Sequence, residues 1–596
     1  MMSSFMPENM TDRDTSQTVS ARAVLACAWP ALLLATVCLL PFLNKAFIND
    51  DPWFLTMAQQ IVKHPMHPMD FQICWNFSNN SLRSGGALFG EEAQGYALVP
   101  TVLGGAHEWM AHLTQLALVW IAVLAMTSLI LRYGWNRLHA IGGALILVAV
   151  APFLPMASNV LPDMLATALA IVAMERLAAW KAEHKAGQGV SVAVALALAA
   201  YARPHLVLLL PLAAFFLLDS IQPREMLSQI RRRFWLWTPV VAGAVLLFVI
   251  IAATREHNPA SNPPTDFTGT QFIRNNLRSY LLYFVFPLPL AACWLANRLK
   301  IGRWLIVCIV TGVAVATLFL RHGLRVVTSF EIIGFVVLAD LLFEALRKRD
   351  HTGVFLLLWV LIPLPIVYYI QLPIKYLLPC LPAVIFLCFR LMEGFSVRVT
   401  RAAAVALIVA STGYSLLILR SDAEYSGFGR DAMYRLIQPH VAAGERVWFS
   451  DQYSSYWYAP LAGAKLTFPG GPQPKPGDLL VVGRIEGEDR ALALFPHRTL
   501  AGEVTHKYRF GRTMGEGIGF YSNLAGYWLW GLGHGKSDRY ELWRIDQDPI
   551  NESIRVEKAT VAYGLSEMRR DTCTKESPQT HRDVTRSPPY LSVQVR

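Results

Sequence analysis

Two neighbouring carboxylates, Asp50 and Asp51, directly follow the first long apolar run of this 596-residue chain. A third carboxylate, Asp163, stands in a turn between two later apolar runs. A carboxylate can take a proton from an acceptor hydroxyl, while Arg and Lys can hold a phosphate and stabilise the charge that grows on it as it leaves. Carboxylates and cations on one membrane surface therefore suit transfer from a phosphate-linked donor to a hydroxyl.

Each of these carboxylates also has a simpler interpretation. Asp before Pro is a common helix start, so Asp50 or Asp51 could cap a helix that begins near Pro52. Asp163 follows Pro162 and could merely favour the first turn of its helix. The residue types alone leave both interpretations open, so the elements that position these residues decide between them.

Composition indicates what those elements are. The chain is 54% hydrophobic and 16% charged, whereas soluble domains carry about 25% charged residues. Apolar runs near the length needed to cross roughly 30 Å of hydrocarbon recur along it. We therefore predict a polytopic α-helical membrane protein with about thirteen transmembrane helices, near residues 22–43, 112–131, 139–157, 162–179, 189–202, 204–218, 235–253, 280–297, 303–320, 325–345, 353–370, 376–391 and 402–419.

Basic residues in the short loops orient these spans. With thirteen spans and a cytoplasmic N-terminus, the Lys and Arg clusters of the short loops all fall on the cytoplasmic side, as in the run Arg231–Arg233. The net charge of +11 then reports orientation, and we expect no nucleic-acid partner. The orientation predicts that Asp50, Asp163, Arg203 and Lys375 all lie at outer ends of spans.

The same orientation divides the chain into four parts. The segment from residue 420 onward is too polar for a membrane, and Val447–Phe449 and Leu479–Val482 are typical of buried strands. We expect a cytoplasmic tail at 1–21, a transmembrane domain at 22–419 with a first outer loop at 44–111, an extracytoplasmic C-terminal α/β domain at 420–570, and a disordered tail at 571–596.

Four short motifs resemble the GT-C glycosyltransferases, and most closely their protein mannosyltransferase and lipid A aminoarabinose transferase branch. Phe47–Trp53 is similar to the acidic first outer loop of that family, and Asn159–Leu165 to its second acidic site. Lys375–Pro382 resembles its basic-Tyr-x-x-Pro-x-x-Pro element, and Tyr280–Phe284 its aromatic segment before an outer Pro turn. The resemblance covers roughly residues 20–420 and implies a GT-C-like fold.

The resemblance also implies an activity: inverting transfer of a sugar from a polyprenyl-phosphate donor to an acceptor hydroxyl at the extracytoplasmic face of a bacterial inner (plasma) membrane. The acceptor would be a lipid, a glycan or a protein, within a bilayer of membrane lipids. The matching positions are listed by role: Asp50 or Asp51 as the general base, Asp163 as the second acidic position, and Arg83, Arg274, Lys375 and Tyr376 as the donor-phosphate site. Leu82–Gly90 departs from the Lys-Pro-Pro-like segment of the family, which leaves the acceptor and the grip on the donor lipid open.

Two other functions remain open. The short apolar runs that meet at Arg203-Pro204 could belong to a lipid or solute transporter or flippase, although the sequence shows no internal repeat. A non-catalytic assembly protein for envelope polysaccharide is the other alternative, with the C-terminal domain as its binding module. The sequence shows no cluster of metal ligands, so we expect no cofactor, and a requirement for a divalent metal stays open.

Overall fold

Helices make up most of the molecule. A computed structural model describes residues 19–73, 83–84, 91–254, 268–299, 324–450, 454–468, 471–483, 490–515, 517–532 and 537–549. Its α-helices are α1 Ala21–Leu39, α2 Asp51–Lys63, α3 Glu92–Ala97, α4 Val99–Leu103, α5 Glu108–Arg132, α6 Arg137–Ala149, α7 Phe153–Ala157, α8 Pro162–Glu183, α9 Ala186–Ala202, α10 Leu209–Phe216, α11 Pro223–Arg232, α12 Thr238–Thr254, α13 Ile273–Tyr283, α14 Leu290–Leu299, α16 Leu324–Arg347, α17 His351–Val360, α18 Leu381–Met392, α19 Val397–Ala442 and α20 Ser454–Leu461. Short 3-10 helices also occur along the chain: η1 Leu40–Phe42, η3 Pro204–Leu208, η4 Phe234–Trp237, η6 Thr270–Phe272, η7 Leu364–Tyr368, η8 Ile374–Cys380 and η9 Arg490–Leu494.

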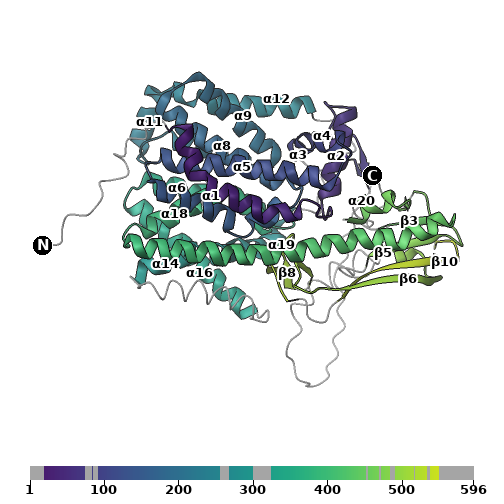
Figure 1. Ribbon diagram of the computed structural model, residues 1–596. Coiled ribbons are helices and arrows are strands. Elements are labelled where there is room, and N and C mark those ends of the chain that lie inside the picture. Colours follow the sequence, from purple (N-terminus) through teal and green to yellow (C-terminus); the bar gives the residue numbers. More distant parts are fainter. Residues whose placement is uncertain are drawn as a thin grey trace, which may run out of the picture. The chain divides into compact units, whose positions relative to one another are not determined.

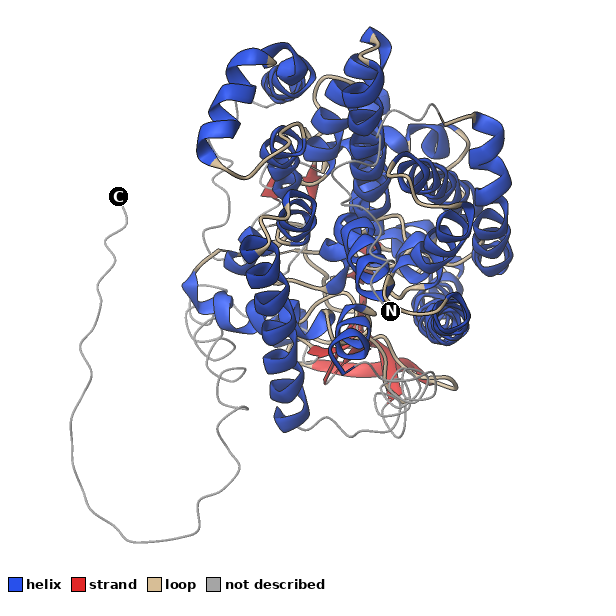
Figure 2. Cartoon of the chain, turned by 90° about the vertical axis from the view of Figure 1, so that its left-hand side faces the viewer, coloured by secondary structure: helices blue, strands red, loops and turns tan. Residues whose placement is uncertain are grey.

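The long helices run side by side in one bundle, and many are seen end-on in the second view (Figures 1 and 2). Among the described residues, six helical segments are long and apolar enough to cross a bilayer: Ala21–Phe42, Glu108–Arg132, Phe234–Thr254, His351–Tyr368, Ile374–Met392 and Val397–Ala442. Apolar side chains such as Phe248 and Val409 are exposed on these segments, which suits contact with lipid. The chain is therefore a multi-pass membrane protein.

The expected count of thirteen spans is not confirmed. Three further apolar helices, within Arg137–Ala149, Ala186–Ala202 and Pro204–Phe216, are shorter than a full span. The span expected near 280–297 is interrupted, because α13 ends at Tyr283 and α14 begins only at Leu290. Pro287 and Pro289 fall in this gap, and proline cannot donate the backbone hydrogen bond that would continue a helix. The span expected near 303–320 lies outside the described residues.

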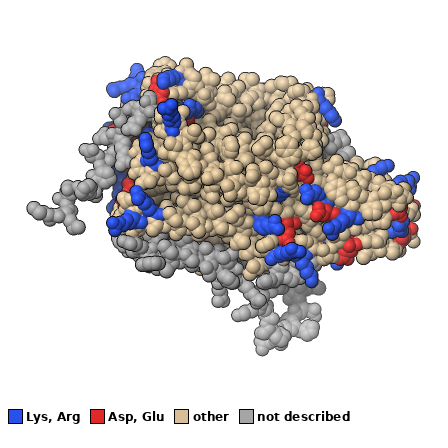
Figure 3. Space-filling model, in the orientation of Figure 1, with Lys and Arg blue, Asp and Glu red and all other residues tan. Residues whose placement is uncertain are grey.

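On the face shown, charged side chains lie mainly toward the two ends of the molecule. Lys and Arg gather at the end of the bundle near α11 and α14, while the wide middle of this face carries almost no charged side chain (Figure 3). At the opposite end, Asp and Glu are mixed with Lys and Arg over the strands. A charge-free belt between two charged ends suits a bundle that spans a membrane.

Helix α19 joins the bundle to the C-terminal strands. A helix of 46 residues is about 70 Å long, more than twice the roughly 30 Å hydrocarbon core. Residues 397–414 of this helix are mostly apolar and none of them is buried, whereas its buried residues lie between Ser415 and Ile437, where it packs on α20, β6 and β10. The domain boundary expected at residue 420 falls inside this continuous helix.

Beside the far half of α19 lies a five-stranded sheet with the order β4-β3-β5-β10-β6 (Figure 1). Its strands are β3 Val447–Phe449, β4 Lys465–Leu466, β5 Leu479–Gly483, β6 Arg498–Lys507 and β10 Ser537–Ile545. Strand β3 pairs in parallel with β4 and β5, and β10 pairs antiparallel with β5 and β6. The buried strands predicted at Val447–Phe449 and Leu479–Val482 are confirmed.

Two small sheets complete the strands. Strands β7 Met514–Gly515, β8 Gly517–Gly519 and β9 Gly526–Trp528 form one, and β1 Gln72–Ile73 pairs with β2 Arg83–Ser84 in the other. Asn523, between β8 and β9, bonds to the backbone N–H of Leu372 and to the side chains of Asn276 and Ser279 on α13. The C-terminal strands are thus hydrogen-bonded into the helical bundle close to Lys375.

Candidate active site

The acidic pair separates into two different environments. Asp51 is fully buried, and its two carboxylate oxygens accept the backbone N–H groups of Ile48 at 3.0 Å and Val160 at 2.9 Å. Burial raises the pKa of Asp51 to about 7, although Lys45 and the two backbone donors oppose that shift. Asp51 has no exposed surface in this structure, and both of its carboxylate oxygens are already engaged by backbone donors.

Asp50 has the properties that Asp51 lacks. It occupies the N-cap position of α2, yet its side chain accepts no capping hydrogen bond, so the helix-cap interpretation does not account for it. The side chain is 40% exposed, and Oδ2 lies 3.9 Å from Nζ of Lys375. Asp50 is therefore an accessible carboxylate held near a cation.

Lys375 reaches Asp50 from η8, in the element that resembles the basic motif of the GT-C family. Its side chain is only 4% exposed, and Nζ lies 5.9 Å from the centroid of the neighbouring Tyr376 ring. An ammonium group buried to this extent needs a negative partner. Asp50 at 3.9 Å is a loose one, which leaves Lys375 able to bind a second anion.

A second ion-pair group lies beside this one. Asp163, in the first turn of α8, pairs with Arg203 at 2.7 Å, and both side chains are buried. Arg203 also binds Glu91, directly before α3, and its guanidinium lies 4.9 Å from the Tyr376 ring centroid. Burial raises the pKa of Glu91, and the charges of Arg203, Asp50, Asp163 and Lys375 all act on that carboxyl. We call this group of five residues the charged cluster: Asp50, Glu91, Asp163, Arg203 and Lys375.

Arg203 keeps an unused donor in this cluster. Its Nε is buried and has no hydrogen-bond partner among the described residues, and the same holds for Nε2 of the nearby His205. The His205 ring stands edge-on to Tyr376 at 5.7 Å. Buried N–H groups normally have partners, so these nitrogens suit a polar ligand.

Replacing Arg203 with Met tests how strongly the fold depends on this ion pair. The change leaves Asp163 buried without its cation, and loss of one partner of a buried pair costs about 3–5 kcal/mol of stability. We expect a large fall in the unfolding temperature of the purified protein, followed by thermal denaturation in detergent.

The control for that prediction is Arg233→Met. Arg233 pairs with Asp219 at 3.1 Å with both side chains about half exposed, and exposed pairs contribute roughly 0–1 kcal/mol. Equal unfolding temperatures for the two variants would contradict a structural role for the Arg203 ion pair.

An apolar cavity of about 340 Å³ lies among α3, α8, α9 and α12. Its lining residues Ala93, Leu165 and Tyr201 each stand two positions along the chain from Glu91, Asp163 and Arg203, respectively. The other lining residues belong to the same region of α3, α8, α9 and α12: Tyr96, Ala97, Leu169, Leu198, Ile250 and Thr254. An apolar cavity in this part of the bundle suits a hydrocarbon chain.

The structure unites some of the sequence-predicted residues and leaves others apart. Asp50, Asp163, Lys375 and Tyr376 lie together in the charged cluster or against it. Arg274 is an exposed residue of α13, and none of the hydrogen bonds or ion pairs of the described residues joins it to the cluster. The side chain of Arg83 lies outside the described residues.

Two members of the cluster had no assigned role from the sequence. The orientation of the spans places Arg203 on the outer side, and two short apolar runs meet at Arg203-Pro204, but no motif gives it a role in the reaction. Glu91 stands outside every motif, and only the fold brings it to Arg203. Among the described residues, no group of three or more His, Cys, Asp or Glu side chains is arranged to hold a metal ion.

Comparisons with known proteins give a structural likeness. No family model matches the chain, and no curated protein matches it. Matching solved structures include the crystal structure of ArnT from Cupriavidus metallidurans bound to undecaprenyl phosphate, at 14% identity, covering 81% of this chain and 97% of that one with a TM-score of 0.42. The apo crystal structure of the same ArnT matches at 15% identity, 75% and 86% coverage, and a TM-score of 0.38.

Proposed function

We propose that this protein transfers a sugar from a polyprenyl-phosphate donor to an acceptor hydroxyl at the extracytoplasmic face of the membrane. The observation that carries the proposal is the pair of Asp50 and Lys375. An accessible carboxylate stands 3.9 Å from a buried ammonium group, so a proton acceptor and a phosphate-binding cation are available in one place.

In the proposed reaction, Asp50 takes the proton of the acceptor hydroxyl as the acceptor oxygen bonds to the anomeric carbon. The bond from that carbon to the phosphate oxygen breaks, and its electron pair leaves with the polyprenyl phosphate. Lys375 stabilises the charge that develops on the departing phosphate. A single displacement of this kind inverts the configuration of the anomeric carbon.

The other members of the cluster have supporting roles in this proposal. Arg203 is held by Asp163 and Glu91, and its unused Nε is available to the polar head of the donor. The apolar cavity among α3, α8, α9 and α12 is suited to isoprene units of the donor. Asp163 acts through Arg203, since its carboxylate is already engaged at 2.7 Å.

The experiment that tests this proposal measures release of polyprenyl phosphate. The purified protein, in liposomes, is supplied with a panel of polyprenyl-phosphate sugars, and a membrane extract serves as a mixture of acceptors. We expect at least one donor to release polyprenyl phosphate only when protein and extract are both present. Movement of the donor between leaflets without release would instead favour a flippase, and the absence of both would favour an assembly protein.

A further inference from the structure

The two carboxylates of the proposed reaction, Asp50 and Asp163, lie next to segments without regular secondary structure. Asp50 ends the connector 43–50 between η1 and α2, and Asp163 lies just after the connector 158–161 between α7 and α8. Irregular backbone lacks the repeating hydrogen bonds of a helix or strand, so its buried polar groups need other partners. The distance between the two acidic positions therefore depends on what joins these connectors.

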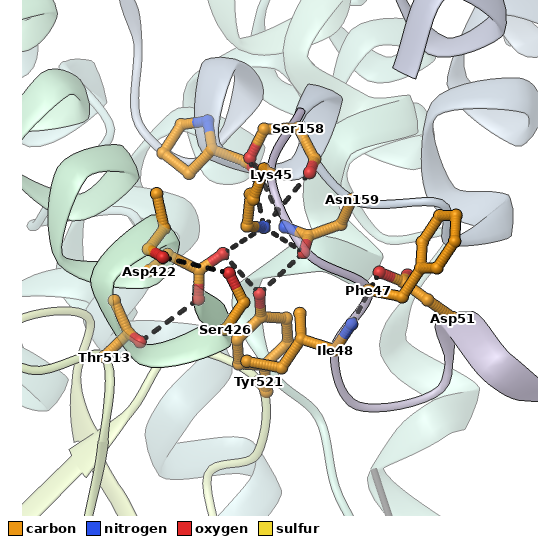
Figure 4. Close-up of polar contacts among 12 residues, drawn as sticks. Lys45, Phe47, Ile48, Asp51, Ser158, Asn159, Asp422, Ser426, Thr513 and Tyr521 are labelled. Atoms are coloured by element: carbon orange, nitrogen blue, oxygen red, sulfur yellow. Dashed lines mark hydrogen bonds and ion pairs between the residues drawn. The ribbon is translucent and has the colours of Figure 1, made fainter. Parts of the chain in front are cut away.

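Buried side chains join the two connectors at both ends. Lys45 Nζ donates to the carbonyl oxygen of Ser158 at 3.1 Å and to Oδ1 of Asn159 at 2.7 Å. At the other end, the Asp51 carboxylate accepts the N–H group of Ile48 (Figure 4). It also accepts the N–H group of Val160. Lys45 and Asp51, which flank residues 46–50, thus join the two connectors at two points.

The far half of α19 and the C-terminal strands complete this arrangement. Lys45 Nζ lies 2.5 Å from Oδ2 of Asp422 on α19, and both side chains have no exposed surface. Tyr521, between β8 and β9, donates to Oδ2 of Asp422 at 2.6 Å and lies 2.7 Å from Oδ1 of Asn159 (Figure 4). Its single hydroxyl therefore contacts two of the three partners of Lys45, Asn159 and Asp422.

Helix α20 holds the same connector from another direction. The hydroxyl of Tyr458 accepts the backbone N–H of Phe47 at 2.9 Å, and Ser454 donates to the carbonyl oxygen of Phe47 at 2.9 Å. Connector 43–50 is consequently hydrogen-bonded to the C-terminal region as well as to the bundle.

We infer that Lys45, Asp422 and Tyr521 are positioning residues, which we call the connector clamp, and that through them the C-terminal region sets the placement of Asp50 relative to Asp163. This inference rests on the proposed function for its catalytic consequence. Its structural half, that Tyr521 orders the two connectors, stands independently of any transfer activity.

The test compares two tyrosine variants of the full-length protein. Tyr521→Phe removes the hydroxyl that joins Asp422 and Asn159 but keeps the ring. Tyr508→Phe is the matched control, because Tyr508 is also buried and also donates to a carboxylate, that of Asp538, within the C-terminal strands. A purely structural role predicts similar behaviour for both variants.

Two readouts separate positioning from stability. We expect Tyr521→Phe to lower kcat about 10-fold while KM for the donor changes less than about 2-fold, since misplacing the base slows the chemical step more than donor binding. We also expect the amides of Ile48 and Val160 to exchange with deuterium about 10-fold faster in this variant. In Tyr508→Phe both quantities should stay at the wild-type value.

Equal kcat and equal amide exchange for the two variants would overturn the connector clamp. If the wild-type protein releases no polyprenyl phosphate, the proposed function fails, and the exchange of Ile48 and Val160 alone decides the clamp. Faster exchange in Tyr521→Phe without a change in kcat would overturn the catalytic half of the inference, because the connectors would then move without affecting Asp50.

Discussion

Asp50→Asn is expected to lower kcat for sugar transfer about 1,000-fold, within the 10²- to 10⁴-fold range that general-base catalysis contributes. The amide keeps the shape of the side chain but cannot take the proton of the acceptor hydroxyl. Because Asp50 is 40% exposed and accepts no capping bond, its replacement should leave the unfolding temperature nearly unchanged. Initial rates of polyprenyl phosphate release and a thermal melt measure both effects.

Two further variants make the Asp50 prediction specific. Asp70→Asn removes an exposed carboxylate of the same outer loop and should keep the wild-type kcat. Asp51→Asn turns an amide group toward a backbone donor that the buried carboxylate accepts, so it should lower the unfolding temperature. If Asp50→Asn retained more than about a tenth of the wild-type kcat, Asp50 would not be the base.

The second large effect is expected at Lys375. Lys375→Met should lower kcat/KM for the donor about 100-fold, the order of magnitude seen when one preorganised charge-stabilising donor is lost. The side chain of Lys375 is only 4% exposed, so water cannot easily replace its charge near the departing phosphate. Release of polyprenyl phosphate over a range of donor concentrations measures the loss.

Lys181→Met is the control for Lys375→Met. Lys181 lies near the end of α8 opposite to Asp163 and pairs with Asp219 at 2.8 Å. It should keep the wild-type kcat/KM, whereas Lys375→Arg, which retains the positive charge, should fall between the two Met variants. Equal kcat/KM for Lys181→Met and Lys375→Met would exclude Lys375 from the donor site.

The membrane architecture was predictable because its signal is local. An apolar run of about twenty residues is sufficient to indicate a span, and short apolar stretches such as Leu479–Val482 indicated strands that the structure confirms. The exact number of spans was harder to predict from the sequence. Hydropathy averages over Phe286–Pro289 and does not register that two prolines there separate α13 from α14.

The site was predictable only where motifs carry it. Asp50, Asp163 and Lys375 come from short recognisable segments, and the structure brings them into one cluster. Sequence alone could not separate Asp50 from Asp51, because the difference lies in the backbone N–H of Val160, more than a hundred residues away. Glu91 and the Lys45–Asp422 pair likewise depend on long-range contacts.

The most direct test of the central claim is the position of the donor in a cryo-electron microscopy structure of Asp50→Asn, which should bind the donor without consuming it. We predict that the phosphate of a polyprenyl-phosphate sugar lies within hydrogen-bonding distance of Lys375 Nζ, with the anomeric carbon facing residue 50. A phosphate bound away from Lys375, or an anomeric carbon turned away from residue 50, would contradict the proposed transfer.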